Sequence, residues 1–140
     1  MEIRRAELRD APELAELMGD LGYPTTAEKM VVRLSAVAAH SDYHTLVAEE
    51  AGRVVGMVAL RLGFYVETDG QFVTMQALVV GKEWQSKGIG TALVGAAEEW
   101  AKARGAKAVV LSSRTSREQA HRFYRHLGYE STGLRFIKSL

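Results

Sequence analysis

The sequence predicts an α/β fold in which a mixed, mostly antiparallel sheet is covered by about four helices. Apolar residues recur at helical spacing in some segments, and β-branched and apolar residues form short runs between turn residues in others. These segments alternate along all 140 residues without a linker or an internal repeat. We therefore expect a single domain, residues 1–140.

The N-terminal segment predicts one strand followed by two helices. Residues 2–6 alternate apolar and charged side chains, as a half-buried strand does. Asp10 is a candidate N-cap for a helix that ends near residues 19–22. A capping pattern at Thr26 then begins a second helix, which continues to about residue 39.

Three longer apolar runs predict the centre of the sheet. Tyr43–Glu50 and Arg53–Phe64 flank a short polar turn with a glycine, which is typical of a hairpin. Gln71–Val80 follows a polar loop, and its last four residues are apolar on both faces, as in a buried strand.

The C-terminal part continues the alternation. Its expected elements are a helix over residues 88–104, a strand Val109–Leu111, a helix capped by Ser116 and closed by Gly128, and terminal strands over residues 129–131 and 134–138.

Composition excludes several classes of function. Eighteen basic and seventeen acidic residues give a net charge of +1, so the broad cationic field of a nucleic-acid-binding protein is missing. No apolar stretch is long enough to cross a membrane, there is no cysteine, and the four histidines show no metal-ligand spacing. We expect a cytoplasmic, metal-free protein that binds neither nucleic acid nor membrane. Its oligomeric state is left open, with a homodimer as one option.

A glycine motif, Gln85-x-x-Gly88-x-Gly90, lies between the buried strand and the following helix. Glycines let the backbone approach a ligand closely, and the first N–H groups of a helix bind anions. A diphosphate is therefore the expected ligand. A Walker motif would need a lysine after Gly90, where Thr91 stands, and a dinucleotide fingerprint would need a third glycine at Leu93.

These residues resemble the GNAT superfamily of N-acetyltransferases. Residues 78–80 followed by Gln85-x-x-Gly88-x-Gly90 are similar to the acetyl-CoA loop of that family. Ala120-x-x-Phe123-Tyr124, followed by Leu127-Gly128-Tyr129, is similar to its second cofactor motif. The resemblance covers nearly the whole chain and implies a GNAT-like fold and transfer of acetyl from acetyl-CoA to an amine.

The resemblance also implies roles for individual residues. Cofactor binding is assigned to Leu78, Val79, Val80, Gln85, Ser86, Lys87, Gly88, Ile89, Gly90, Thr91, Arg117 and Tyr124. The strand residues would pair with the pantetheine arm, and the loop N–H groups would hold the pyrophosphate. Tyr124 would stand near the thioester sulfur and protonate the leaving thiolate. Arg117 stands where many family members have asparagine, so its contact with the cofactor is left open.

The general base is the least obvious catalytic group. Family members often carry a glutamate on the strand that corresponds to Gln71–Val80, and here Thr74 and Gln76 take its place. Neither side chain is basic near neutral pH. Either Glu67 or Asp69 in the preceding loop accepts the proton through water, or the amine arrives uncharged.

The acceptor is expected to be a small primary amine, with a peptide N-terminus or lysine next, and aminoglycosides by family analogy. Tyr23, Tyr65 and Glu67 form an aromatic and acidic set that suits a cationic amine. Two other functions remain open at this stage: a module that senses acetyl-CoA without turning it over, and a nucleotide-binding domain of another fold.

Overall fold

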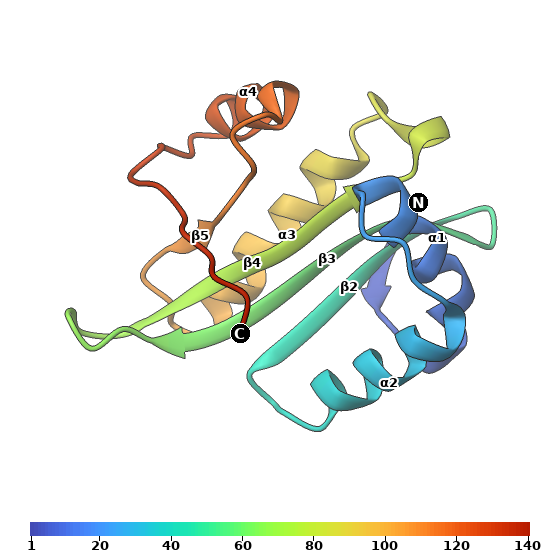
Figure 1. Cartoon of the computed structure of the whole chain (residues 1–140), viewed down its shortest axis with the longest axis horizontal. Coiled ribbons are helices and arrows are strands. Elements are labelled where there is room, and N and C mark those ends of the chain that lie inside the picture. The colour runs from blue at the N-terminus through green and yellow to red at the C-terminus, as the bar shows by residue number, and fades with distance from the viewer. The chain divides into compact units, whose positions relative to one another are not determined.

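The computed structural model describes residues 1–140, and its α-helices and strands follow the predicted order as far as residue 126 (Figure 1). The elements are β1 (Glu2–Arg5), the 3-10 helix η1 (Leu8–Asp10), α1 (Ala11–Leu21), α2 (Ala27–Ala38), β2 (Tyr43–Glu50), β3 (Arg53–Phe64), β4 (Gln71–Val80), the 3-10 helix η2 (Lys82–Trp84), α3 (Ile89–Ala103), β5 (Val109–Leu111) and α4 (Glu118–His126). Backbone contacts divide the chain into two compact units, Met1–Val110 and Leu111–Leu140.

The five strands form one sheet in the order β1-β2-β3-β4-β5. The strands from β1 to β4 pair antiparallel with their sequence neighbours, so that Val47 faces Met57, which in turn faces Val79. β5 joins at the start of β4, where the N–H of Lys107 donates to the Gln71 carbonyl at 2.8 Å. The predicted mixed, mostly antiparallel sheet is confirmed.

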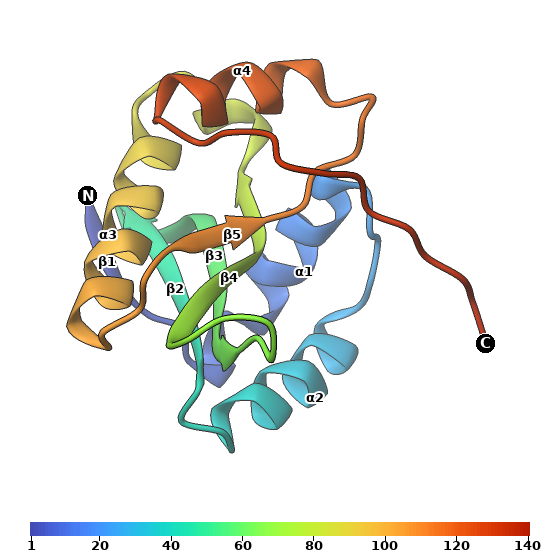
Figure 2. The same cartoon turned by 90° about the vertical axis from the view of Figure 1, so that its left-hand side faces the viewer.

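Helices pack on both faces of the sheet within the larger unit. α1 and α2 cover one face, where Leu14 joins Val47 and Met57 in a buried cluster. α3 covers the other face through Leu93 and Ala97, which are fully buried. Figure 2 shows α3 on one side of the strands and α1 and α2 on the other. Burial on both faces explains why β3 and β4 are so rich in apolar residues.

The predicted end of the first helix and the predicted start of the second are confirmed. Thr26 caps α2, because its Oγ1 accepts a hydrogen bond from the N–H of Lys29 at 3.2 Å. α1 ends at Gly22, whose φ of +103° lies in the left-handed region and whose N–H donates to the Gly19 carbonyl.

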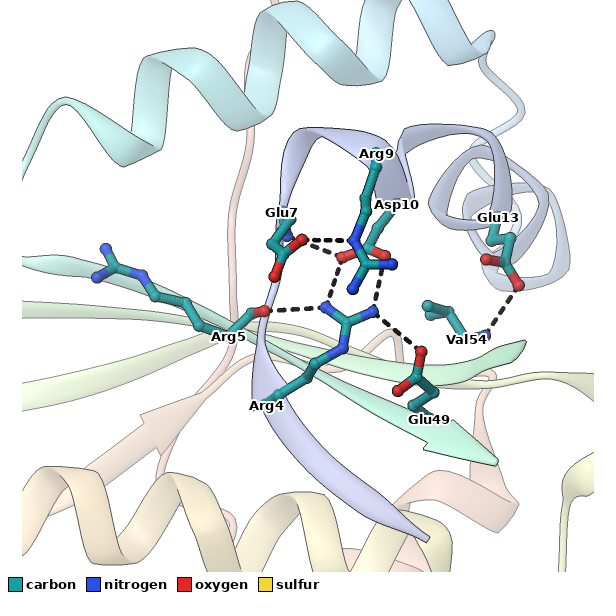
Figure 3. Close-up of polar contacts among 8 residues, drawn as sticks. All are labelled: Arg4, Arg5, Glu7, Arg9, Asp10, Glu13, Glu49 and Val54. Carbon is teal, nitrogen blue, oxygen red and sulfur yellow. Dashed lines mark hydrogen bonds and ion pairs between the residues drawn. The ribbon is translucent and has the colours of Figure 1, made fainter. Parts of the chain in front are cut away.

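A polar cluster ties α1 to the sheet (Figure 3). Asp10, at the start of α1, is only 2% exposed and receives two hydrogen bonds from the guanidinium of Arg4 on β1. The same guanidinium lies 3.4 Å from the Glu49 carboxylate on β2. One turn further along α1, the Glu13 carboxylate accepts the N–H of Val54 at 2.8 Å. The N-terminal end of α1 is therefore bonded directly to β1 and β3, and the same Arg4 guanidinium reaches Glu49 on β2.

In the smaller unit, α4 ends as predicted at Gly128, which has a φ of +94°. The N–H of Gly128 donates to the Arg125 carbonyl and that of Tyr129 to the Tyr124 carbonyl, both at 3.0 Å. The predicted cap at Ser116 is wrong by one position, because Arg117 is the N-cap residue and no side chain caps the helix.

The predicted terminal strands over residues 129–131 and 134–138 are also wrong, since residues 127–140 contain neither helix nor strand. The prediction rested on alternating apolar residues and on turn residues, but a strand also needs a backbone partner. Leu134 and Phe136 are 75% and 88% exposed, so the apolar side chains that suggested strands are not packed.

Candidate active site

A β-bulge interrupts β4 in the middle of the strand. Ala77 pairs with Ala59 on β3, whereas Met75 pairs with the next residue, Leu60, so Gln76 is an extra residue without a partner. Its side chain is exposed. Bulges are frequent beside active sites, because they re-aim a side chain and end regular pairing. The sequence gives no glycine or proline signal for this bulge.

No acid lies on β4, so the polar groups around the bulge are uncharged. Thr74 is half-buried and Gln76 is exposed, and these are the positions at which the resemblance would place a glutamate. An amide and a hydroxyl can orient a substrate by hydrogen bonds, but they cannot take up a proton near neutral pH.

The loop after β4 contains two residues in the left-handed region of backbone conformation. Ser86 and Gly88 both have positive φ, of +63° and +82°, and the amide of Gln85 donates to the Val80 carbonyl at 3.3 Å. A Cβ built on Gly88 meets nothing within 4 Å, so space is open at this turn. α3 begins at Ile89, directly after it.

The start of α3 supplies donors to this loop. The first N–H groups of an α-helix have no partner within the helix. In α3 these are the N–H groups of Ile89, Gly90 and Thr91. The positive end of the helix dipole lies at the same place. The donors and the dipole together favour an anion, and a diphosphate has the size to contact several N–H groups.

Gly56 on β3 allows α3 to pack directly against the sheet. A Cβ at this position would lie 3.0 Å from Leu93, 3.1 Å from the Val79 carbonyl oxygen and 3.3 Å from Ile89. Because Gly56 also pairs with Val80, its small size lets the first turn of α3 pack beside the end of β4. No sequence motif marks this glycine, because its role depends on packing against α3.

Tyr124 lies on α4 in the smaller unit, among other aromatic rings. Its ring makes edge contacts with Phe123 at 5.4 Å and Tyr129 at 6.0 Å between centroids. Burial raises the pKa of Tyr124, and the positive charge of Arg117 opposes that rise. The phenol is therefore protonated near neutral pH and has a proton to donate.

Comparison with known proteins identifies the family. The profile of the Acetyltransferase (GNAT) family matches residues 8–129. The chain belongs to this family. The match includes the loop, the bulge and Tyr124, and the predicted family and enzyme class, an N-acetyltransferase that uses acetyl-CoA, are confirmed.

Two relatives and one solved structure extend this finding. An aminoalkylphosphonate N-acetyltransferase of Salmonella typhimurium is 37% identical over 71% of this chain. The matched part is 64% of that relative's length, just under two thirds. An aminoglycoside N(6')-acetyltransferase of Stenotrophomonas maltophilia is 31% identical over 93% of this chain and 86% of its own. A GNAT acetyltransferase of Staphylococcus aureus has a TM-score of 0.86 at 27% identity, covering 99% of this chain and 98% of its own.

In this acetyltransferase, the predicted cofactor residues of the larger unit lie together. Leu78, Val79 and Val80 pair with β3 and lead into the loop, and residues 85–91 form the loop and the first turn of α3. The hydrogen bonds from residues 107 and 108 reach β4 only at Gln71 and Val73, at the opposite end of the strand from Val80.

Arg117 and Tyr124 belong to the smaller unit of the acetyltransferase. Arg117 occupies the N-cap position of α4, and its charge acts on the Tyr124 hydroxyl. His121, on the same helix, has its Nε2 2.8 Å from the Arg114 carbonyl oxygen.

The predicted acceptor residues come from two separate segments of the chain. Tyr23 follows the end of α1, where its N–H donates to the Met18 carbonyl at 2.8 Å. Tyr65 and Glu67 lie in the turn between β3 and β4, and the Tyr65 ring stacks on Phe72 at 4.9 Å. At about 3.3 Å per residue, the ten residues of β4 span about 30 Å from this turn to the cofactor loop.

The structure contains no group of three or more His, Cys, Asp or Glu side chains arranged to hold a metal ion. None of its helices is both long and apolar enough to cross a membrane.

Proposed function

We propose that this acetyltransferase moves the acetyl group of acetyl-CoA to the primary amine of a small molecule, by direct attack within a ternary complex. The observation that carries the proposal is the loop between β4 and α3, where the N–H groups of residues 89–91 are free and Gly88 leaves open space. The family match supports the same reaction.

The residues of the larger unit fit acetyl-CoA. N–H groups of Ser86 to Thr91 would hold the diphosphate, and the main chain of Leu78, Val79 and Val80 would pair with the pantetheine arm as an added strand. The apolar residues at this end of β4 support that pairing. Arg117 is proposed as a further phosphate contact.

The thioester supplies an activated acyl group, and the nitrogen loses one proton before attack and another as the amide forms. The neutral amine nitrogen bonds to the carbonyl carbon, the carbon–sulfur bond breaks, and the thiolate takes up a proton. We assign the proton on sulfur to the Tyr124 hydroxyl, because burial keeps this phenol protonated, and the second proton lost by the nitrogen restores the phenol. Proximity of the two substrates contributes a further part of the rate.

The first proton leaves the ammonium before attack. Glu67 is proposed to accept it through water, with Asp69 in the same exposed turn as the alternative. A third route needs no side chain, because an amine of low pKa arrives partly neutral. The uncharged residues at the bulge, Thr74 and Gln76, are proposed to orient the acceptor.

A small acceptor is supported by the relatives, one of which is named for aminoalkylphosphonates and another for aminoglycosides. Both are small amines. Tyr23, Tyr65 and Glu67 are proposed as acceptor contacts, since all three side chains are accessible and belong to segments that flank the sheet.

We also propose that residues 1–140 act as one N-acetyltransferase domain, because the family profile runs across both compact units. We also propose a cytoplasmic location. The proposal includes no nucleic-acid or membrane partner, and a homodimer is one option for its oligomeric state.

The test is turnover of acetyl-CoA with a panel of amines, followed as free thiol. The panel contains an aminoalkylphosphonate, an aminoglycoside, a simple alkylamine and a lysine peptide. We expect thiol release that depends on a small amine and produces its N-acetyl derivative by mass spectrometry. Binding of acetyl-CoA without turnover of any amine would instead support the sensor function, and preference for the peptide would overturn the small-molecule acceptor.

A further inference from the structure

The helices α1 and α2 cover only part of their face of the sheet. On β3, Met57 is 4% exposed and belongs to the cluster under these helices, Ala59 is half-buried, and Arg61 is exposed. Residues two apart on a strand share a face, so these three side chains form one row that runs out from beneath the helices. In Figure 1 the turn between β3 and β4 extends past α1 and α2. This face of the sheet is therefore open at Arg61.

The pairing register sets the neighbours of Arg61 on this face. Arg61 is opposite Tyr43 on β2 and opposite Thr74 on β4. Directly opposite residues of antiparallel strands place their side chains on the same face, with Cβ atoms about 4.5–5.5 Å apart. The bulge residue Gln76 lies on β4 two residues after Thr74. Arg61 is therefore next to the two uncharged residues that are proposed to orient the acceptor.

The guanidinium of Arg61 lies over the sheet rather than away from it. Its Cζ is 5.8 Å from the ring centroid of Tyr43, a distance at which a cation is attracted to an aromatic face. The same Cζ would lie 4.0 Å from a Cβ built on Gly63, the next residue of the row on β3. Gly63 has no positive φ, so its contribution here is the space that it leaves for the guanidinium.

No carboxylate of the protein neutralises Arg61. Its side chain forms no ion pair, whereas Arg4 pairs with Asp10 and Arg104 with Asp42. A guanidinium stays charged at any physiological pH and presents five N–H donors. These donors suit the oxygens of a carboxylate, phosphonate or phosphate, which can accept two parallel hydrogen bonds. The open face beside Thr74 therefore carries a positive charge that only a ligand or solvent can meet.

We propose that Arg61 determines the specificity of the acetyltransferase by binding an anionic group of the acceptor, so that the substrates are small amines that also carry a carboxylate, phosphonate or phosphate. This inference rests on the proposed function and names the class of its small acceptor. Thr74 and Gln76 orient the amine, and the anion at the other end of the molecule pairs with the guanidinium. An acceptor without an anion leaves Arg61 unpaired and gains nothing from it.

The first experiment measures kcat/KM of the parent with four amines of equal chain length: an aminoalkylphosphonate, an amino carboxylate, an alkylamine and a diamine. Hydrogen bonds to charged groups typically change binding by about 10-fold or more, so at least one anionic amine should exceed the alkylamine by about that factor. The better of the phosphonate and the carboxylate identifies the anion. The diamine, with a second cation in place of the anion, should be the poorest of the four.

Substitutions of Arg61 should change the preference itself, expressed as the ratio of kcat/KM for the anionic amine to that for the alkylamine. We expect Arg61→Gln to lower this ratio by about 10-fold or more, mainly through KM for the anionic amine, and Arg61→Lys to retain part of it. Arg61→Glu should reverse the order and favour the diamine. Arg53→Gln is the matched control, because Arg53 is an exposed arginine at the other end of the same strand.

Gly63→Val tests the position of the guanidinium without removing the charge. Valine suits a strand, but its side chain would occupy the space beside the Arg61 Cζ. We expect the same ratio to fall, while KM for acetyl-CoA stays at the parent value. In the parent, added salt should weaken the preference for the anionic amine, and this dependence should be shallower in Arg61→Gln, a change that a merely structural role would not produce.

The outcomes separate the two proposals. If the parent acetylates the alkylamine as well as both anionic amines, the role of Arg61 is overturned and the proposed function stands. The role is also overturned if Arg61→Gln slows all the amines by one common factor, because the residue would then support the fold rather than select the substrate. If the parent acetylates none of the amines, the proposed function fails, and the inference fails with it.

Discussion

Arg4 donates two hydrogen bonds to the buried carboxylate of Asp10, with N···O distances of 2.9 and 2.8 Å (Figure 3). A third donor, the N–H of Glu7, lies 2.8 Å from the same carboxylate. These contacts join β1 to the start of α1, and they use one of the few charged groups in the interior of the larger unit. A buried ion pair is costly to break from one side, because the remaining charge is left without a partner.

Asp10→Asn should therefore destabilise the protein strongly. We expect the free energy of unfolding to fall by about 3–5 kcal/mol, the usual cost of removing one partner of a buried pair. Urea unfolding followed by circular dichroism measures this difference. Arg9→Gln is the control, because Arg9 is exposed and pairs only with the exposed Glu7. A similar loss in both variants would contradict the importance of burial.

The same pair predicts a dependence on acid. The Arg4 guanidinium, through its hydrogen bonds, holds the pKa of the Asp10 carboxyl below its ordinary value. The contribution of the pair to stability is therefore complete above the unfolded-state pKa of about 3.9, and it is lost as the pH falls through the lower folded-state pKa. Below about pH 4, the Tm of the parent should fall more steeply than that of Asp10→Asn.

His44 predicts a second dependence on pH, in a different range. Its ring stacks on Trp100 at 4.8 Å, and the Arg104 guanidinium lies over the same indole. Burial lowers the pKa of His44, and the charges of Arg5 and Arg104 lower it further. The folded protein therefore favours the neutral ring, so stability is complete above the unfolded-state pKa of about 6.5 and is lost as the pH falls below it.

Melting curves between about pH 5 and 8 test this prediction. The Tm of the parent should drop on the acid side of this range, and the Tm of His44→Phe should drop less, because phenylalanine keeps the stacking and cannot be protonated. His40→Gln, at an exposed histidine nearby, should follow the parent. Parallel curves for the parent and His44→Phe would show that His44 does not carry the effect.

Gly90→Val should separate cofactor binding from folding. A side chain in the first turn of α3 would stand where the diphosphate approaches, so we expect CoA affinity to fall by 10-fold or more, about the effect of losing a charged hydrogen bond. The Tm should change little, because valine is a better helix former than glycine. Gly95→Val, in the same helix with open space around it, should leave CoA affinity unchanged.

Gly88 is less suitable for this test, although the sequence motif suggests it equally. Its φ of +82° means that valine would be strained there even without a ligand, at a cost of about 1–2 kcal/mol. We expect Gly88→Val to lower both the Tm and CoA affinity. Unchanged CoA affinity in a folded Gly90→Val protein would argue against the diphosphate site.

Tyr124→Phe should lower turnover without changing stability. Phenylalanine keeps the ring contacts with Phe123 and Tyr129 and removes only the hydroxyl. Because a thiolate leaves readily, we expect kcat to fall by roughly 10–100-fold, at the low end for general acid catalysis, with CoA affinity and Tm nearly unchanged. Tyr43→Phe in the larger unit is the control. Parent-like kcat, with chemistry rate-limiting, would make Tyr124 a packing residue.

Glu67→Gln tests the proposed base. If Glu67 accepts the amine proton through water, kcat near neutral pH should fall by about 10-fold or more, and Asp69→Asn should have little effect. The reverse pattern would assign the base to Asp69. Parent-like rates in both variants, together with a rate that rises as the amine becomes neutral, would show that no side chain of this turn is the base.

The local signals of the sequence determined most of the secondary structure. The cap at Thr26, the glycine after α1 and the polar turn around residues 51 and 52 act through backbone sterics and nearby hydrogen bonds, so they can be recognised without the fold. The two cofactor motifs are local as well, which is why the family could be predicted from residues 78–90 and 120–129.

Only the tertiary structure decided which residues meet. The bulge at Gln76 depends on register with β3, the burial of Asp10 depends on Arg4 and Glu49, and Gly56 matters because α3 packs against it. The position of the Arg61 guanidinium also depends on the fold, because β2 has to pair with β3 before the Tyr43 ring lies beside it. The prediction of terminal strands was wrong for the same reason. The alternation of apolar and polar residues is visible over residues 129–138, but a strand exists only when another strand supplies its hydrogen bonds.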